Sequence, residues 1–241
     1  RSISNPKPFI DSNILGVFNI LEILKTQKKR LVHISTDEVF GSLRTGSANE
    51  EYRLNPSSPY SASKASAELL INSYVHTFNI DSVITRCTNN YGPHQYPEKL
   101  IPKTIILAHR NEKIPIYGNG KSIRDWIFVE DHCDAIMKVL FKGNSGETYN
   151  ISSQNELDNL TIVKKILKLM NKSLDLMEFV NERPGEDHRY SLDSLKIRTK
   201  LKWNHKINFE DGIRKTIEWY LIKNPWEKID SKSLKNIPWK R

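Results

Sequence analysis

The sequence predicts a soluble α/β protein with a mainly parallel sheet, because short apolar or β-branched runs alternate with longer segments of helical periodicity. Strand-like runs occur at residues 31–34, 81–86, 114–117, 126–129 and 148–151. Helical patterns occur at residues 13–27, 60–78, 99–110, 130–141, 160–170, 193–201 and 209–222. The segment 42–58 is polar and contains Pro and Gly, so we expect a surface loop there.

The composition argues against several classes of protein. The 241 residues, 38% hydrophobic and 27% charged, suit a globular chain of one large or two small domains. No apolar run approaches the roughly 20 residues of a membrane span, and no signal-peptide pattern is present. We therefore expect a cytoplasmic protein without a membrane partner. The net charge is +9, but the lysines are scattered, which argues against a nucleic-acid partner.

The two cysteines, Cys87 and Cys133, stand in neither metal-ligand nor redox spacing. We expect both to be reduced thiols, and no metal site is predicted.

Two adjacent acids directly follow the strand expected at 31–34. Asp37 and Glu38 come after Ser35 and Thr36, at the carboxyl end of that strand. Open α/β sheets bind their ligands at this edge. Two carboxyls in different environments can serve as one acid and one base. A solvated turn is the alternative explanation, and this segment alone does not separate the two.

A second candidate pair opens the helix expected at 60–78. Tyr60 and Lys64 are four residues apart and share a helix face. A nearby ammonium can lower the pKa of a phenol, so that the tyrosine acts as a base. The same spacing recurs at Tyr117 and Lys121, where two intervening glycines argue against a helix. Spacing alone is therefore weak support.

Further motifs contain residues suited to anions or amides. The segment 89–93, Asn-Asn-Tyr-Gly-Pro, is typical of a plain turn. Lys99 opens a predicted helix, and both helix N-termini and lysines attract phosphate. Arg124 and Arg183 suit bidentate phosphate contacts, although single arginines more often form surface ion pairs.

In chain order the motifs are STDEVFG, PSSPYSASKAS, TNNYGPHQYPEKLIP, IYGNGKSIRDWIFVEDH, GETYNIS, ERPGEDHRY and GIRKTIEWY. This series closely resembles that of the dTDP-glucose 4,6-dehydratases, from residue 1 to about residue 226. The resemblance implies the extended short-chain dehydrogenase/reductase fold. Residues 1–113 would then form a partial, doubly wound Rossmann domain. Residues 114–241 would mainly form a smaller C-terminal α/β substrate domain, with some segments returning to the first domain.

The family has a Gly-rich turn that binds NAD at the start of its Rossmann domain, and no G-x-x-G-x-x-G occurs in this sequence. We expect that the N-terminal part of the domain, roughly 80 residues, is missing from this chain.

The resemblance also implies a tightly bound NAD and a nucleoside-diphosphate glucose substrate. Tyr60 would take the proton of the sugar 4-hydroxyl, Lys64 would lower the Tyr60 pKa and hold the nicotinamide ribose, and Thr36 would bond near O4. Glu38 would remove the C5 proton. Asp37 would protonate the departing 6-hydroxyl, which gives a 4-keto-6-deoxy sugar.

The remaining expected contacts rest on the same resemblance. Ser12 and Asn90 would lie at the cofactor. Besides Thr36, the substrate would contact Asn89, Lys99, Leu100, Pro115, Ile116, Tyr117, Arg124, Asn159, Arg183, Pro184 and Gly185. The sequence departs from the usual pattern at Glu186, where His is common, and at Phe40, where Tyr is common.

Several alternatives stay open. Thymidine and uridine nucleotides differ by too little for this sequence to separate dTDP-glucose from UDP-glucose. A sugar 4-epimerase of the same superfamily would not need both acids, and a noncatalytic sugar-nucleotide module would need neither the acids nor the Tyr-Lys pair. Family members are commonly homodimers, and the helices at 13–27 and 60–78 are the expected dimer surface.

Overall fold

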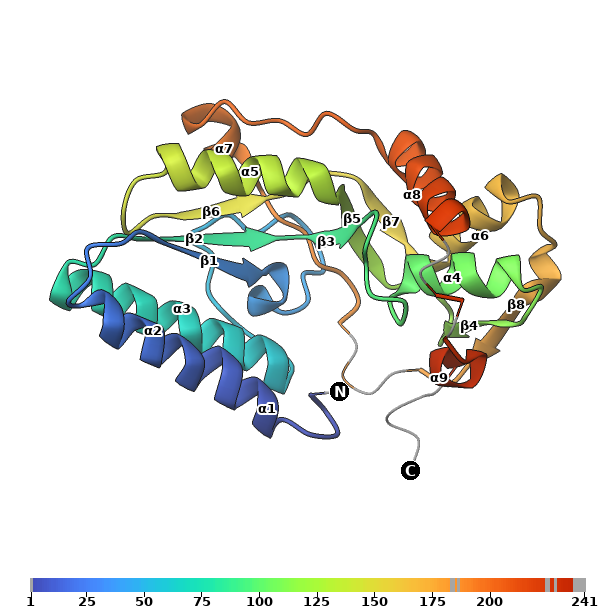
Figure 1. Cartoon of the computed structure of the whole chain (residues 1–241), viewed down its shortest axis with the longest axis horizontal. Coiled ribbons are helices and arrows are strands. Elements are labelled where there is room, and N and C mark those ends of the chain that lie inside the picture. The colour runs from blue at the N-terminus through green and yellow to red at the C-terminus, as the bar shows by residue number, and fades with distance from the viewer. Residues whose placement is uncertain (1, 183–184, 186, 224–225, 228, 236–241) are drawn as a thin grey trace.

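The computed structural model describes residues 2–182, 185, 187–223, 226–227 and 229–235. Figure 1 shows two groups of elements side by side. One is a sheet with helices on both faces. The other is a set of helices and short strands beyond the carboxyl ends of the strands of that sheet. Residues of the expected site occur in both groups.

The first sheet is parallel and has the order β1-β2-β6. Its strands are β1 (Leu31–Thr36), β2 (Ser82–Cys87) and β6 (Thr148–Ile151). The register runs from Leu31 opposite Ser82 to Thr36 opposite Cys87. All six residues of β2 are buried, as expected for a central strand between helical layers.

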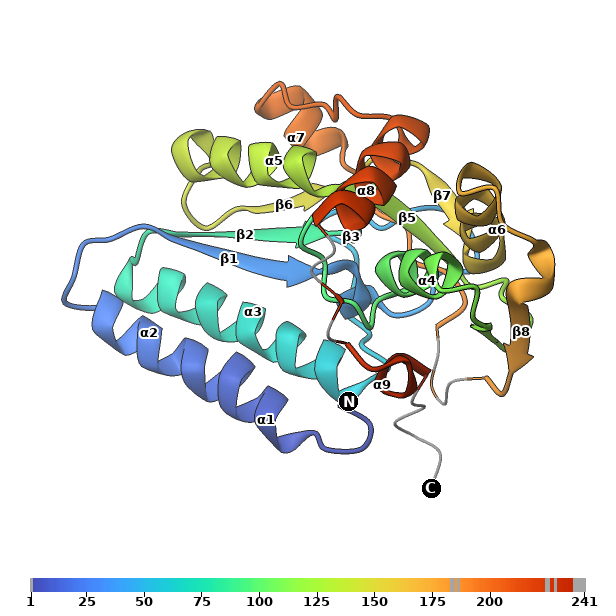
Figure 2. The ribbon, with the colours of Figure 1, turned by 45° about the vertical axis from the view of Figure 1, so that its right-hand side comes forward.

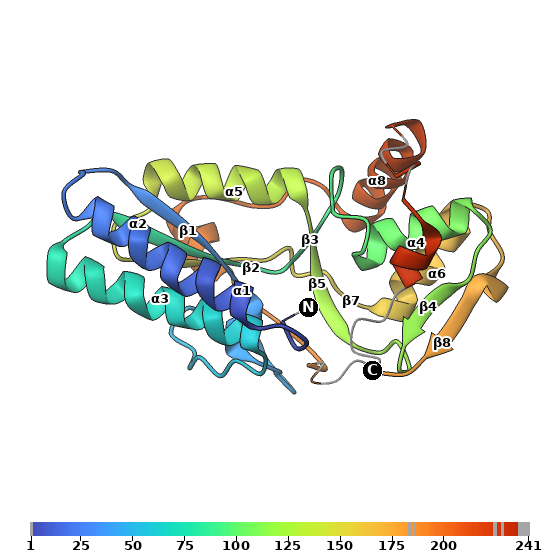
Figure 3. The same ribbon diagram turned by 60° about the horizontal axis from the view of Figure 1, so that its bottom comes forward.

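Helices cover both faces of this sheet (Figure 3). On one face lie α2 (Gly16–Leu24) and α3 (Pro59–Phe78), whose apolar cluster includes Leu21, Ile71 and Ile84. On the other face lie α5 (Val129–Lys142) and α7 (Leu195–Lys200), which pack around Val139, Tyr149 and Trp203.

The helix that leads into α2 contains a π-helical turn. It begins as α1 (Lys7–Ile10), continues through η1 (Asp11–Leu15) and becomes α2 without a break. In this turn Asn13 Nδ2 donates to Ser63 Oγ on α3 at 2.9 Å. The wider turn therefore brings a polar contact to the residue next to Lys64.

Helix α3 begins where the sequence indicates. Ser58 and Ser61 form a reciprocal capping box, and Pro59 occupies the first turn. The helix ends at Asn79, whose φ of 53° is left-handed. Tyr60 and Lys64 thus lie in the first turns, close to the carboxyl ends of β1 and β2.

The second group, seen in Figure 2, is built on short strands and helices. In one sheet, β5 (Ile123–Phe128) pairs in parallel with β3 (Asn89–Tyr91) and antiparallel with β7 (Glu156–Asp158). In another, β4 (Ile114–Tyr117) pairs in parallel with β8 (Met177–Val180). The remaining elements are η2 (Asp37–Phe40), α4 (Leu100–His109), α6 (Asn159–Leu169), η3 (Leu174–Leu176), α8 (Phe209–Lys223) and α9 (Ser231–Lys235). One apolar cluster joins α4, α6 and α8.

The expected strands and helices are confirmed with small changes of bounds, and the loop at 42–58 contains no helix or strand. The prediction of a plain turn at 89–93 was wrong, because residues 89–91 form β3. The prediction also lacked β7, β8, η3 and α9. Both cysteines are free thiols, as expected. The division at residue 113 stays a prediction, although β6, from beyond it, joins the first sheet.

Within the described residues, no helix is long and apolar enough to cross a membrane.

Candidate active site

The two acids lie on a tight turn at the end of β1. Thr36 is the N-cap of η2, and its Oγ1 accepts a hydrogen bond from the Glu38 N–H at 3.3 Å and donates to Asp37 Oδ1 at 3.2 Å. Gly41 ends the turn with a φ of 68°, and a Cβ there would collide with the Asn55 carbonyl. The loop 42–58 therefore packs closely against this turn at Asn55.

Asp37 is a carboxyl held in its neutral form. Its exposed fraction is 4%, and burial, followed by the charge of Glu38, raises its pKa to about 8. Arg124 acts in the opposite direction but more weakly. Within the described residues, Oδ2 is buried and has no hydrogen-bond partner. Asp37 therefore presents a proton at neutral pH.

Tyr60 faces the acid turn. The pKa of its phenol is raised by burial first and then by the charges of Glu38 and Cys87, which indicates that the phenol lies close to the acids. Burial is the main cause of the raised pKa, and the Lys64 ammonium donates to the Ile34 carbonyl of β1 at 2.6 Å. The lowering of this pKa by Lys64 that the resemblance implies stays a prediction.

Asn90 and Cys87 lie beside the Tyr60 end of the site. Asn90 Nδ2 is 3.4 Å from Cys87 Sγ and donates to the Thr88 carbonyl at 3.3 Å. Burial raises the pKa of the Cys87 thiol to about 12, and Sγ lies 3.6 Å from the Ser35 carbonyl. The sequence analysis missed Cys87. Its position at the end of a buried strand, opposite Thr36, is the signal that could have identified it.

Arg124 approaches the acids from β5. Its Nη2 donates to the Asp187 carbonyl at 2.8 Å, and its guanidinium lies 4.4 Å from the centre of the Tyr190 ring. Tyr190 donates to Asp187 Oδ2 at 2.6 Å. Its pKa is raised by burial and by the charge of Glu38, so Tyr190 belongs to the same site. It was also missed, although it ends the ERPGEDHRY motif.

Two of the expected substrate residues, Arg183 and Pro184, lie outside the described residues, as does Glu186. Gly185 is exposed, with a φ of 66°.

The expected nucleotide contacts lie in the second group. Lys99 is the exposed N-cap of α4, and Leu100 is the first residue of that helix. The segment Ile114–Tyr117 is β4, which contains Pro115, Ile116 and Tyr117. Lys103 of α4 lies 5.7 Å from the centre of the Tyr117 ring, so the two segments are adjacent. They are separate in sequence from the acid turn.

The last three expected residues have different surroundings. Asn89 pairs with Trp126 in β3 and β5, two residues from Arg124. Asn159 begins α6, and its N–H donates to the Ser122 carbonyl at 3.2 Å, which also places it near Arg124. Ser12 is exposed in the π-helical turn and bonds only Asn13 among the described side chains.

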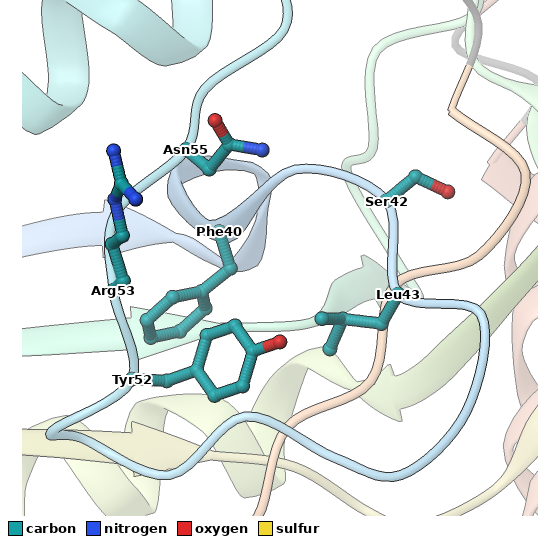
Figure 4. A pocket seen from close by; sticks show the side chains of 6 residues that line it. All are labelled: Phe40, Ser42, Leu43, Tyr52, Arg53 and Asn55. Atoms are coloured by element: carbon teal, nitrogen blue, oxygen red, sulfur yellow. The ribbon is translucent and has the colours of Figure 1, made fainter.

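A separate hollow of about 310 Å³ lies on the outer side of the acid turn (Figure 4). It is lined by Phe40, Ser42, Leu43, Tyr52, Arg53 and Asn55. None of these is an expected site residue. Phe40 follows the acids in the chain, and the centre of its ring lies 5.9 Å from that of Tyr52. The hollow is therefore lined by residues that pack against the acid turn, not by the acids themselves.

Comparison with known proteins identifies the family of this chain. The family model of GDP-mannose 4,6 dehydratase matches residues 1–216. A dTDP-glucose 4,6-dehydratase from Xanthomonas campestris is 41% identical over 246 residues, which covers 94% of this chain and 70% of that protein. The chain belongs to the dTDP-glucose 4,6-dehydratase family.

Solved structures of the dTDP-glucose 4,6-dehydratase family have the same fold. The enzyme from Streptomyces venezuelae, solved with NAD bound, has a TM-score of 0.92 at 39% identity and covers 94% of this chain and 70% of its own. The enzyme from Bacillus anthracis, in complex with NAD, has a TM-score of 0.88 at 43% identity, with 97% and 73% covered. The expected extended short-chain dehydrogenase fold is thereby confirmed.

An enzyme of different activity lies somewhat further away. The UDP-glucuronic acid 4-epimerase from Bacillus cereus has a TM-score of 0.83 at 29% identity, with 87% of this chain and 67% of that chain covered. The dTDP-glucose 4,6-dehydratases are thus nearer in both sequence and structure.

Proposed function

We propose that this chain contains the catalytic and substrate-binding residues of a nucleoside-diphosphate-glucose 4,6-dehydratase that acts on dTDP-glucose or UDP-glucose. The observation that carries the proposal is the acid turn. A buried Asp37, protonated at neutral pH, accepts a hydrogen bond from Thr36, stands beside a second acid and lies close to the phenol of Tyr60. Oxidation and re-reduction at C4 alone would need the phenol but not the two acids.

In the proposed reaction Tyr60, Glu38 and Asp37 each transfer one proton. Tyr60 would accept the proton of the 4-hydroxyl as C4 is oxidised, and it must be a phenolate to do so, the form that the positive charge of Lys64 favours. The 4-keto group then acidifies the C5 hydrogen, and Glu38 accepts that proton. Asp37 donates its own proton to the 6-hydroxyl, so that the C6–O bond breaks and water leaves. The environments of the two acids suit this division, because burial keeps Asp37 protonated.

Bound NAD would supply the acceptor for the hydride of C4 and return it to C6, and Glu38 would give its proton back to C5. The residues present fit the nicotinamide end of this cofactor. Asn90 Oδ1, Thr88 Oγ1 and Ser35 Oγ are buried, and no described residue hydrogen-bonds them. Buried polar atoms are almost always paired in folded proteins, so a polar ligand at this place would satisfy them. Tyr60, Lys64, Asn90 and Ser12 are the residues proposed to hold it.

The substrate would extend from the acids towards the second group of elements. Arg124, and Arg183 from the segment outside the described residues, would hold the diphosphate. The proposed nucleotide and sugar contacts are Asn89, Lys99, Leu100, Pro115, Ile116, Tyr117, Asn159, Pro184 and Gly185. The adjacency of α4 and β4 supports one nucleotide site between them. In this proposal residues 1–113 mainly serve the cofactor and residues 114–241 mainly the substrate.

A homodimer is proposed through α2 and α3. Phe18, Ile20, Ile23 and Leu69 are exposed on these helices, which lie side by side on one face of the sheet. Sedimentation as a monomer at micromolar concentration would count against this surface.

The test uses the product of the whole gene, incubated with NAD and with dTDP-glucose or UDP-glucose in separate reactions. We expect a 4-keto-6-deoxy product, detected by its absorbance in alkali and by the loss of one water in mass. Product from one sugar identifies the nucleotide. A mass-neutral epimer, or binding without product, would overturn the proposed roles of Asp37 and Glu38. A variant with Asp37→Asn and Glu38→Gln is the matched control for background elimination.

A further inference from the structure

A histidine next to the site has no role in the scheme above. His33 lies on β1, three residues before Thr36, and its side chain is 9% exposed. Its Nε2 is 3.3 Å from the Nζ of Lys64. The same ammonium donates to the carbonyl of the next residue, Ile34, at 2.6 Å. Two adjacent residues of β1 therefore define the position of the Lys64 ammonium.

Packing alone does not explain a histidine at this position. Leu31, two residues earlier on the same side of β1, packs into the apolar cluster between the sheet, α2 and α3. An aliphatic side chain would fill such a position without a polar atom to satisfy. A buried imidazole is unfavourable unless its nitrogens find partners, and Lys64 is the partner that the structure provides.

The imidazole is neutral in this environment. Burial first, and then the charge of Lys64, lowers the pKa of His33 to about 3. A neutral ring has one nitrogen with a free lone pair, and an ammonium has only donors. The contact between the two residues therefore requires that Nε2 accepts from Nζ, with the ring proton on Nδ1.

An uncharged acceptor has a consequence that a carboxylate would not have. A carboxylate within contact distance would pair with the ammonium and cancel its field. The imidazole fixes the position of Nζ and leaves the positive charge in place. An ammonium has three N–H groups. Ile34 and His33 use two of them, so one remains to point at Tyr60 or at a ligand hydroxyl.

We propose that His33 is a positioning residue for Lys64: its Nε2 accepts a hydrogen bond from the ammonium and aims the remaining N–H at the reaction site without neutralising the charge. The inference rests on the proposed function, because Lys64 matters to the reaction only if Tyr60 serves as the base. The experiment therefore includes a variant that tests Lys64 by itself.

The product of the whole gene is compared with four variants: Lys64→Met, His33→Leu, His33→Gln and His132→Leu. His132 is the matched control, since it is equally buried, at 7% exposed, lies on α5 and has no place in the proposed reaction. We expect His33→Leu to lower kcat by about tenfold to a hundredfold with little change in KM, because Nζ loses its position. His33→Gln, whose amide oxygen can accept from Nζ, should restore most of the rate.

The outcomes separate the two proposals. Normal turnover in Lys64→Met would overturn the proposed role of Lys64. An inactive Lys64→Met with a normal His33→Leu would overturn only the role of His33. Equal losses in His33→Leu and His33→Gln would also overturn it, because they would reflect packing rather than hydrogen bonding, as would a similar loss in His132→Leu.

A measurement on the unsubstituted protein is independent of variant folding. Nitrogen NMR of the His33 ring should show a neutral imidazole with the proton on Nδ1 at neutral pH. A proton on Nε2, or a cationic ring, would rule out the hydrogen bond from Lys64 and with it the proposal.

Discussion

Arg86 and Glu68 form a buried ion pair that joins β2 to α3. Arg86 Nη2 lies 2.7 Å from Glu68 Oε2, and the exposed fractions of the two side chains are 6% and 1%. Arg86 also donates to the Glu50 carbonyl at 2.9 Å and stacks over the Phe40 ring at 4.8 Å. One guanidinium thus connects the strand, the helix of Tyr60 and Lys64, and the turn that contains the acids.

Removal of one partner should therefore be costly. We expect Glu68→Gln to lower the free energy of unfolding by roughly 3–5 kcal/mol, because it leaves Arg86 charged and buried without its counter-charge. Urea unfolding of this chain measures the change. The double variant Glu68→Leu with Arg86→Met should lose much less. The exposed pair of Glu210 and Arg214 is the control, and Glu210→Gln should have no measurable effect. A small effect of Glu68→Gln would contradict the burial of the pair.

The raised pKa of Asp37 predicts a pH dependence of stability. In the unfolded chain this carboxyl ionises near pH 4, whereas in the folded chain it keeps its proton up to a pKa of about 8. Between these values the folded state binds more protons, so the free energy of unfolding falls as pH rises. Asp37→Asn should remove that contribution, which is at most about 1.4 kcal/mol per pH unit. Unfolding curves at several pH values test this, and a constant difference between variant and parent would contradict it.

Tyr60 and Glu38 should fail at different steps. In the product of the whole gene, Tyr60→Phe removes the acceptor of the 4-hydroxyl proton, so no reduction of NAD is expected on mixing with substrate. Glu38→Gln leaves that acceptor in place but cannot take the C5 proton, so reduced cofactor should accumulate without loss of water. Nicotinamide absorbance and product mass measure the two events. Equal loss of cofactor reduction in both variants would contradict this division of roles.

Asp125 should be essential to the segment beside Arg124. Its carboxylate is 1% exposed and accepts five hydrogen bonds from the turn that follows β6. Asp125→Ala leaves these donors buried without an acceptor, so we expect a loss of several kcal/mol in unfolding free energy. Thermal unfolding measures it, with the exposed Asp81→Ala as a comparison of the same side-chain type. A loss no larger than that of the comparison would mean that the turn finds other acceptors.

Much of the fold follows from local signals in the sequence. Helix α3 has its proline and its serine cap in the chain itself, and β2 has an unbroken run of residues that suit a buried strand. The acid turn was placed correctly because it follows such a strand. The missed strands are different. β7 has three residues and β8 four, and each gains its hydrogen bonds only from a strand distant in sequence.

The site, like the fold, could be predicted from the sequence only in part. The roles proposed for Asp37 and Tyr60 follow from motif order, but the direction of the Tyr60 pKa could not be predicted, because it depends on burial and on the charges of Glu38 and Cys87. Tyr190 reaches the acids only because Arg124 stacks on it and the 187–190 segment folds back towards β5. Neither the direction of the Tyr60 pKa nor the position of Tyr190 beside Arg124 can be predicted from the spacing of residues in the sequence.

The π-helical turn at residues 11–15 also predicts where homologous chains can differ in length. One residue added to an α-helix rotates everything beyond it by about 100°, and a π turn absorbs such an insertion locally. Deletion of one residue within 11–15 would restore a regular α-helix and keep Val17 and Leu21 facing the sheet. Deletion of one residue within 18–20 would swing Leu21 out of the core. Length variation among homologous chains should therefore concentrate in this one turn of the helix and spare the turns on either side.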